Sequence, residues 1–200
     1  MDGSVILKAG AIAHLTDARY FAAYGVDLAG FCFHDGSADY IDPVSAAAVK
    51  GWLSGPQFVG EFRDRDSEEM AAMISISTVK IIQVNKPSLQ QAVNLPDFEI
   101  ILEVDGSESD IELSGLSNRV SHLLLDGNAL SEEEIKTYLK RVQPILPVLL
   151  DYKFTSENID IIIPEWKPAG LNIRGSSEEQ VGLKGFEDLD EVMEKLVYAP

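Results

Sequence analysis

The sequence predicts a single closed barrel of eight parallel strands, the (β/α)8 or TIM barrel, over residues 1–200. Short β-branched or apolar runs alternate with amphipathic runs, which is typical of strand and helix units in a parallel sheet rather than of a sandwich. Eight such pairs follow one another without a linker. The chain has 200 residues, somewhat below the ~250 that are usual for this fold, so its loops must be short.

The expected strands are short and mostly apolar, and they span 5–7, 28–33, 57–62, 79–84, 99–104, 120–125, 145–150 and 171–173. The expected helices lie between them, at 16–24, 43–53, from 67, 88–93, 109–116, 131–142, from 156, and 186–196. A helix therefore follows every strand, as parallel strands require for their crossover connections.

Residues that favour helix ends punctuate this series. Thr16 is expected to cap the first helix, and Gly25 to take the left-handed conformation after its end. Pro43 suits a first turn because it has no N–H to leave unpaired. Ser131 opens a helix with acidic residues first and basic residues last, which complements the helix dipole, and Pro144 ends it.

An open, doubly wound sheet is the structural alternative. That fold would predict a glycine-rich dinucleotide turn after the first strand. The sequence there reads AGAIAH and lacks the G-x-G-x-x-G spacing. A closed barrel is therefore the better prediction.

Composition excludes several classes of partner. The chain has 33 acidic and 16 basic residues and a formal charge of −17, whereas nucleic-acid binding rests on Lys and Arg neutralising phosphates. No stretch approaches the roughly 20 apolar residues of a membrane helix, and the start, MDGSVILKAG, lacks the pattern of a signal peptide. We expect a soluble, cytoplasmic protein that binds neither nucleic acid nor membrane.

Cys32 is the lone cysteine and can form no internal disulfide. Without a second cysteine or clustered histidines the sequence has no zinc-binding pattern, so neither a metal nor a cofactor is expected. Cys32 lies within an apolar strand, which predicts a buried core thiol.

Three collinear stretches carry a family resemblance. The first is VILKAGAI with TDARYFAAYGVDLAGFCF and the loop SADYIDP. It resembles the opening of phosphoribosylanthranilate isomerase, whose motifs are Lys-Ile-Cys-Gly-Ile, an Asp-Ala pair, Gly-Phe-x-Phe and Ser-Pro-Arg-Tyr-Val. The matching residues are Lys8, Asp17, Ala18, Gly25, Asp27, Gly30, Phe31, Phe33, Ser37 and Tyr40.

The other two stretches extend the resemblance over nearly the whole chain. FVGEF and VKIIQVNK resemble Val-Gly-Val-Phe and Val-Gln-Leu-His-Gly, with Gln83 retained but Asn85 and Lys86 in place of His and Gly. LLLDGNA, PVLLDYKFTSENI and PAGLNIRGSSEEQVGLKGFEDL are similar to the family's closing half in order and spacing.

The resemblance implies an Amadori rearrangement in tryptophan biosynthesis, an intramolecular oxidoreduction of the isomerase class that needs an acid and a base. It assigns Asp126 as the general acid, which must be protonated near neutral pH to act. Gly10 occupies the place of the family's catalytic cysteine, and glycine has no side chain to take a proton.

The resemblance also implies a set of substrate and phosphate contacts: Lys8, Gln83, Lys153, Arg174, Gly175 and Ser176. This set departs from the family's pattern, because the arginine of Ser-Pro-Arg has become Asp39 and most phosphate-loop glycines are replaced. Acidic residues follow several strands, which predicts an acidic mouth: Asp39, Glu61, Glu103, Asp105, Asp126 and Asp151.

Three hypotheses of function follow. The leading one is a divergent isomerase-like barrel whose reaction is weak or lost, with an altered ligand of small, anionic, phosphoribosyl type. The second is an active isomerase that uses Asp151 or Asp39 as a substitute base. The third is a non-catalytic barrel that acts as an interaction partner. The fold alone does not choose among them, and the sequence leaves the oligomeric state open.

Overall fold

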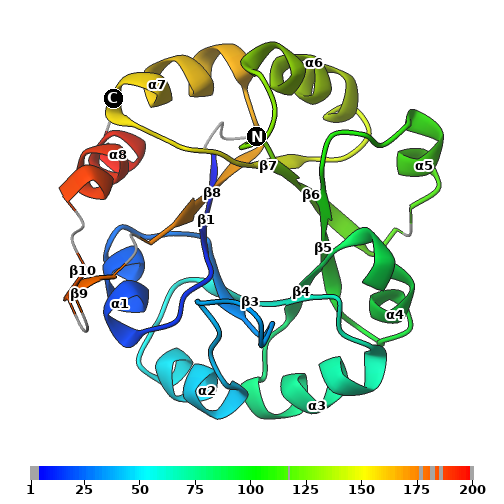
Figure 1. Cartoon of the computed structure of the whole chain (residues 1–200), viewed down its shortest axis with the longest axis vertical. Coiled ribbons are helices and arrows are strands. Elements are labelled where there is room, and N and C mark those ends of the chain that lie inside the picture. Colours follow the sequence, from blue (N-terminus) through cyan, green and yellow to red (C-terminus); the bar gives the residue numbers. More distant parts are fainter. Residues whose placement is uncertain (1–4, 117, 176–177, 181–182, 185–186, 199–200) are drawn as a thin grey trace.

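A computed structural model describes residues 5–116, 118–175, 178–180, 183–184 and 187–198. Eight parallel strands close into a barrel in chain order, and helices surround it (Figure 1). The strands are β1 (Ile6–Gly10), β2 (Leu28–Cys32), β3 (Gln57–Arg63), β4 (Ile81–Val84), β5 (Glu99–Val104), β6 (Val120–Asp126), β7 (Val148–Asp151) and β8 (Gly170–Arg174). β1 pairs with both β2 and β8, so the sheet has no free edge and the predicted barrel is confirmed.

The helices form the outer ring seen in Figure 1. They are α1 (Leu15–Ala23), α2 (Pro43–Gly51), α3 (Ser67–Ser77), α4 (Leu89–Val93) after the 3-10 turn η1 (Lys86–Ser88), α5 (Asp110–Ser114), α6 (Glu132–Val142), α7 (Ser156–Ile161) with the π-helical turn η2 (Ile162–Trp166), and α8 (Glu187–Tyr198). Among the described residues, no helix is long and apolar enough to cross a membrane.

The structure confirms two of the predicted helix-end residues and contradicts a third. Gly25 has a φ of +73°, and Ser131 caps α6 by accepting a hydrogen bond from the backbone N–H of Glu134, both as predicted. The prediction for Thr16 was wrong, because α1 begins at Leu15 and His14 holds the N-cap position without a side-chain cap bond.

One element was not predicted. A two-stranded antiparallel pair, β9 (Glu178–Gln180) and β10 (Leu183–Lys184), lies between β8 and α8. Strands of three and two residues are too short to show an alternating pattern in the sequence. The pair follows Arg174, Gly175 and Ser176 in the chain, which the resemblance assigns to substrate and phosphate contacts.

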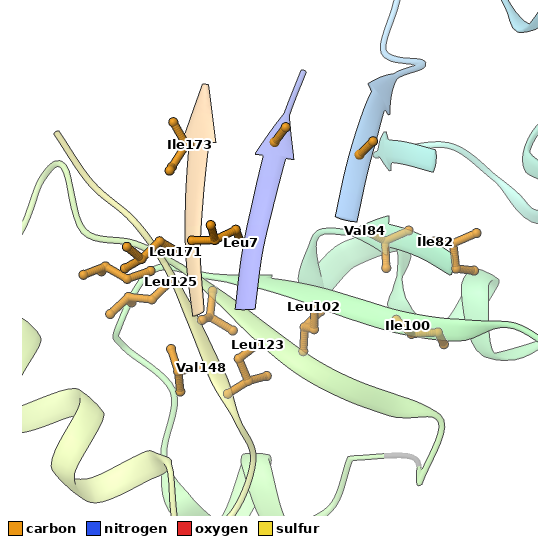
Figure 2. Packing of buried hydrophobic residues seen from close by; sticks show 14 of the residues in the cluster. Leu7, Ile82, Val84, Ile100, Leu102, Leu123, Leu125, Val148, Leu171 and Ile173 are labelled. Atoms are coloured by element: carbon orange, nitrogen blue, oxygen red, sulfur yellow. The ribbon is translucent and has the colours of Figure 1, made fainter. Parts of the chain in front are cut away.

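Alternation along the strands divides the core into two layers. One set packs outward between the sheet and the helices, and Figure 2 shows part of it, with the register partners Leu7 and Leu171 side by side. A second, separate cluster faces the barrel axis and consists of Leu28, Val59, Ile81, Ile101, Leu124 and Leu149, with Ile6 packed against it. This inner cluster fills the barrel, so polar side chains nearer the carboxyl ends of the strands rest on an apolar layer.

Gly170 lies on β8, where the barrel closes against β1 and packs closely on both neighbouring strands. A Cβ added there would lie 2.6 Å from the backbone oxygen of Ile6 and 2.5 Å from the Leu149 side chain. The Gly170→Ala variant should lose about 2 kcal/mol of unfolding free energy, since such overpacking typically costs 1–3 kcal/mol and a paired strand cannot yield. Urea unfolding measures it. Gly51→Ala is the control, because nothing lies within 4 Å of its added Cβ. Equal stability of the two variants would contradict this closure.

Candidate functional site

On the inner face of the barrel, the side chains change from apolar to mostly polar over two residues along each strand. Two residues beyond each member of the inner apolar cluster stand Gly30, Glu61, Gln83, Glu103, Asp126 and Asp151. Because side chains alternate with a period of two, these positions face the same way and lie nearer the carboxyl ends. That rim is where barrel enzymes place their active sites.

Strand register brings residues far apart in sequence together at this rim. Lys8 is the Cα partner of Asn172, Asn172 of Asp151, and Asp151 of Asp126. The four residues therefore stand side by side on β1, β8, β7 and β6. Gly175 directly follows Arg174 at the end of β8, whereas Ser176 lies outside the described residues.

Lys8 forms a buried ion pair at the centre of this polar layer. Its side chain is fully buried, and its Nζ lies 2.5 Å from Glu61 Oε1 and 2.9 Å from Asn172 Oδ1. Glu61 also accepts the backbone N–H of Ala11. A Cβ at Gly30 would overlap the Glu61 carboxylate, so glycine leaves the room for the pair. Lys8, predicted as a substrate contact, thus lies below the surface with its charge neutralised.

Asp151 continues the network toward solvent. Its Oδ2 accepts hydrogen bonds from Asn172 Nδ2 at 2.8 Å and from Arg174 Nη2 at 2.7 Å and Nε at 3.1 Å. Burial alone would lower the pKa of Arg174, but attraction to Asp151, the hydrogen bonds to it and the charges of Glu61 and Glu103 together outweigh burial and raise the pKa above its ordinary value. The chain of contacts runs from Glu61 through Lys8, Asn172 and Asp151 to Arg174.

Asp126 lies at the solvent-exposed end of β6. Its Oδ1 accepts hydrogen bonds from the backbone N–H and the Nδ2 of Asn128, at 3.1 and 3.0 Å. Asn128 Nδ2 also lies 3.5 Å from Asp151 Oδ1. The residue that the resemblance assigns as general acid is therefore open to solvent and next to a second carboxylate.

The position assigned to the catalytic base has no room for a side chain. A Cβ added at Gly10 would lie 2.7 Å from Asn172 Oδ1 and 3.0 Å from its Nδ2. Asn172 is itself held from both sides, by Lys8 and by Asp151. The space beside Gly10 is thus occupied by an anchored amide.

Cys32 gives no substitute nucleophile or base. It is buried on β2 as predicted, and burial raises the pKa of its thiol. A raised pKa keeps the thiol protonated and poorly reactive at neutral pH.

Two of the remaining predicted acids, Glu103 and Asp105, accept hydrogen bonds from neighbouring residues. Gln83 is buried and donates from Nε2 to Glu103 Oε1 at 2.7 Å. Hydrogen bonds from Ser107 lower the pKa of Asp105. The backbone N–H of Asp39 donates to Ser37 Oγ in the loop before α2.

A pocket of about 480 Å³ opens at the rim above this network. It is lined by Arg63, Asp126, Asn128, Asp151, Tyr152, Lys153, Phe154, Asn172, Ile173, Arg174 and Leu189. The size lies within the 300–1,000 Å³ typical of small-molecule sites. Four of the predicted residues meet here, Asp126, Asp151, Lys153 and Arg174, whereas Lys8 and Gln83 do not line the pocket.

The pocket is less acidic than the sequence predicts. Three cations and two carboxylates line it, because Glu61 and Glu103 are paired deeper in the barrel. The sequence reasoning missed Arg63 and Asn172. Arg63 could have been found as a basic residue directly after the third predicted strand, and Asn172 as an amide side chain inside an apolar strand. Within the described part of the chain, no group of three or more His, Cys, Asp or Glu is placed to hold a metal ion.

Comparisons with known proteins point to one family. A family model for N-(5'-phosphoribosyl)anthranilate (PRA) isomerase matches residues 7–195. A crystal structure of phosphoribosyl anthranilate isomerase from Thermus thermophilus is 24% identical, with a TM-score of 0.80 over 95% of this chain and 97% of that chain. The Thermotoga maritima enzyme is 19% identical, with a TM-score of 0.79 over 96% and 98%.

A third structure shows such an isomerase in complex with reduced 1-(o-carboxyphenylamino)-1-deoxyribulose 5-phosphate. It is 18% identical, with a TM-score of 0.77 over 96% of this chain and 98% of that chain. Comparison with curated protein sequences gave no match. At these identities the structural likenesses show the fold.

The buried Lys8–Glu61 pair makes a stability prediction. Lys8→Met should lose about 3–5 kcal/mol of unfolding free energy, because it leaves the Glu61 carboxylate buried and unpaired. Lys8→Met/Glu61→Gln should recover most of that loss, since neither position then carries a charge. Lys136→Met in the exposed Lys136–Glu132 pair is the control and should change stability by less than about 1 kcal/mol. If urea unfolding showed the double variant to be as unstable as the single one, the pair would not be the central constraint.

Proposed function

The chain belongs to the N-(5'-phosphoribosyl)anthranilate isomerase family, and we propose that its isomerase reaction is weak or lost while its mouth pocket binds a small phosphorylated ligand. The proposal has a catalytic part and a ligand part. Different residues support each.

The observation that carries the catalytic part is the filled space at the base position. Gly10 has no side chain to accept a proton, and Asn172 stands where one would project. Loss of a general base typically slows a reaction about 10²- to 10⁴-fold. The rearrangement moves a proton from carbon, so it depends strongly on that base.

The fixed network supports the same conclusion. Lys8 and Arg174, which the resemblance would use on the substrate, are each bound to a carboxylate of the protein. A substrate anion would have to compete with Glu61 or Asp151 for them. Hydrogen bonds and charge interactions that these two side chains make within the protein cannot at the same time stabilise a transition state.

The ligand part rests on the pocket itself. Arg63, Lys153 and Arg174 give it more positive than negative charge, although the whole chain carries −17. Tyr152 and Phe154 add aromatic wall. The isomerase crystallised with a deoxyribulose 5-phosphate derivative is a structural neighbour, which makes a phosphorylated sugar a reasonable ligand class.

One observation favours the second candidate, an active isomerase. Asp126 and Asp151 are register partners and both line the pocket, so they could serve as acid and base. Against this, the Asp151 Oδ2 already accepts three hydrogen bonds, two of them from Arg174. That oxygen would have to give up one of these hydrogen bonds before it could take a proton from a substrate.

Complementation tests the proposal directly. Expression of the chain in a tryptophan-requiring strain that lacks this isomerase should not restore growth at a normal rate, because Gly10 offers no side chain to act as the base. Growth curves beside a Thermus thermophilus isomerase control measure the effect. Full growth would overturn the catalytic part and favour the second candidate.

Restoring the thiol alone should not restore the enzyme. Gly10→Cys is expected to have a kcat/KM within about tenfold of that of the unchanged protein, because Asn172 blocks the thiol. A working general base would typically raise the rate by about 10²- to 10⁴-fold. Gly10→Cys/Asn172→Gly removes the obstruction and should be the more active of the two. Steady-state assays decide, with Cys32→Ser as the thiol control. A competent Gly10→Cys single variant would refute the steric argument.

A further inference from the structure

Arg63 stands apart from the rest of the pocket lining. It is the last residue of β3, whereas every other described lining residue lies between Asp126 and Leu189. β3 and β7 are on opposite sides of an eight-stranded ring. Arg63 therefore reaches the pocket from across the barrel mouth.

The backbone at Arg63 is strained. Its φ is +53°, in the left-handed region that a residue with a Cβ rarely adopts. The register against β4 also shifts here, with Glu61 opposite Gln83 but Arg63 opposite Val84. One extra residue on β3 is the pattern of a β-bulge, which re-aims side chains and is frequent next to active sites. Such strain persists where the surrounding structure or the function requires it.

The pocket cations differ in availability. Arg174 is bound to Asp151 by two hydrogen bonds. Within the described part of the chain, the side chains of Arg63 and Lys153 have neither a hydrogen bond nor an ion pair. Two cations without protein partners thus line one pocket.

We propose that Arg63, together with Lys153, forms the oxyanion-binding site of the mouth pocket, and that the bound group is a phosphomonoester. This rests on the ligand part of the proposed function. A guanidinium presents a planar fork that fits phosphate oxygens, whereas Lys153 adds a point charge. Asp39 stands in place of the arginine of the family's Ser-Pro-Arg motif. Arg63, on the neighbouring strand, again places an arginine at the mouth.

Titration of the full chain with ribose 5-phosphate, followed by calorimetry and amide chemical shifts, tests the site. The unchanged protein should bind in the millimolar range. Arg63→Gln should weaken binding at least tenfold, and Arg63→Lys should weaken it less. Arg19→Gln is the matched control, because it removes one exposed arginine charge from α1, outside the pocket, and should leave binding unchanged.

A stability measurement separates binding from a structural role. Arg63→Gly should raise the midpoint of urea unfolding, since glycine adopts positive φ without strain, while losing ribose 5-phosphate binding as Arg63→Gln does. If Arg63→Gly is instead less stable than the unchanged protein, Arg63 is retained for the fold and the inference is wrong.

The remaining outcomes distinguish this inference from the proposed function. Unchanged binding by Arg63→Gln, with loss in Arg174→Gln, would overturn the role of Arg63 and leave the ligand pocket standing. No binding by the unchanged protein would overturn the ligand part of the proposed function as well. Equal binding of inorganic phosphate and ribose 5-phosphate would show that the site holds the phosphate group alone and contributes nothing for the sugar.

Discussion

A fully buried ammonium group at the centre of the barrel constrains everything around it. A charge removed from water needs a compensating charge and hydrogen-bond acceptors, and Lys8 finds them in Glu61 and Asn172. Gly30 must stay small to admit the Glu61 carboxylate. Asn172, once its oxygen faces Lys8, turns its amide nitrogen to Asp151. One buried charge thereby fixes the side chains of β3, β7 and β8 at the mouth.

Such a network leaves few polar groups free at the barrel axis. Residues that act on a substrate keep hydrogen-bonding capacity free for it, whereas here Lys8 and Arg174 are both committed to carboxylates of the protein. The free capacity lies at the periphery, with Asp126, Lys153 and the strained Arg63. The proposed ligand site therefore lies at the rim and not at the barrel axis.

The sequence predicted the fold well because each strand and helix has its own local pattern. The β/α alternation and the residues at helix ends require only short-range information, and the misplaced Thr16 cap shifts one helix start without changing the topology. The site was harder. Glu61 and Asn172 meet Lys8 only through register across three strands, and no local pattern states that register. Arg63 reaches the pocket because of a bulge, which the period-two alternation does not anticipate.

Gly10 and Asn172 are sterically coupled, which bears on the proposed loss of the base. A side chain at position 10 requires Asn172 to withdraw, since the added Cβ would meet its Oδ1 at 2.7 Å. Withdrawal removes an acceptor from Lys8 and a donor from Asp151, both buried. Leaving a buried group unsatisfied costs about 1–3 kcal/mol, and more for a charged one, which is a large part of a typical folding free energy. The glycine, the asparagine and the buried lysine therefore form a unit, and a change that restores catalytic chemistry at one of them destabilises the other two.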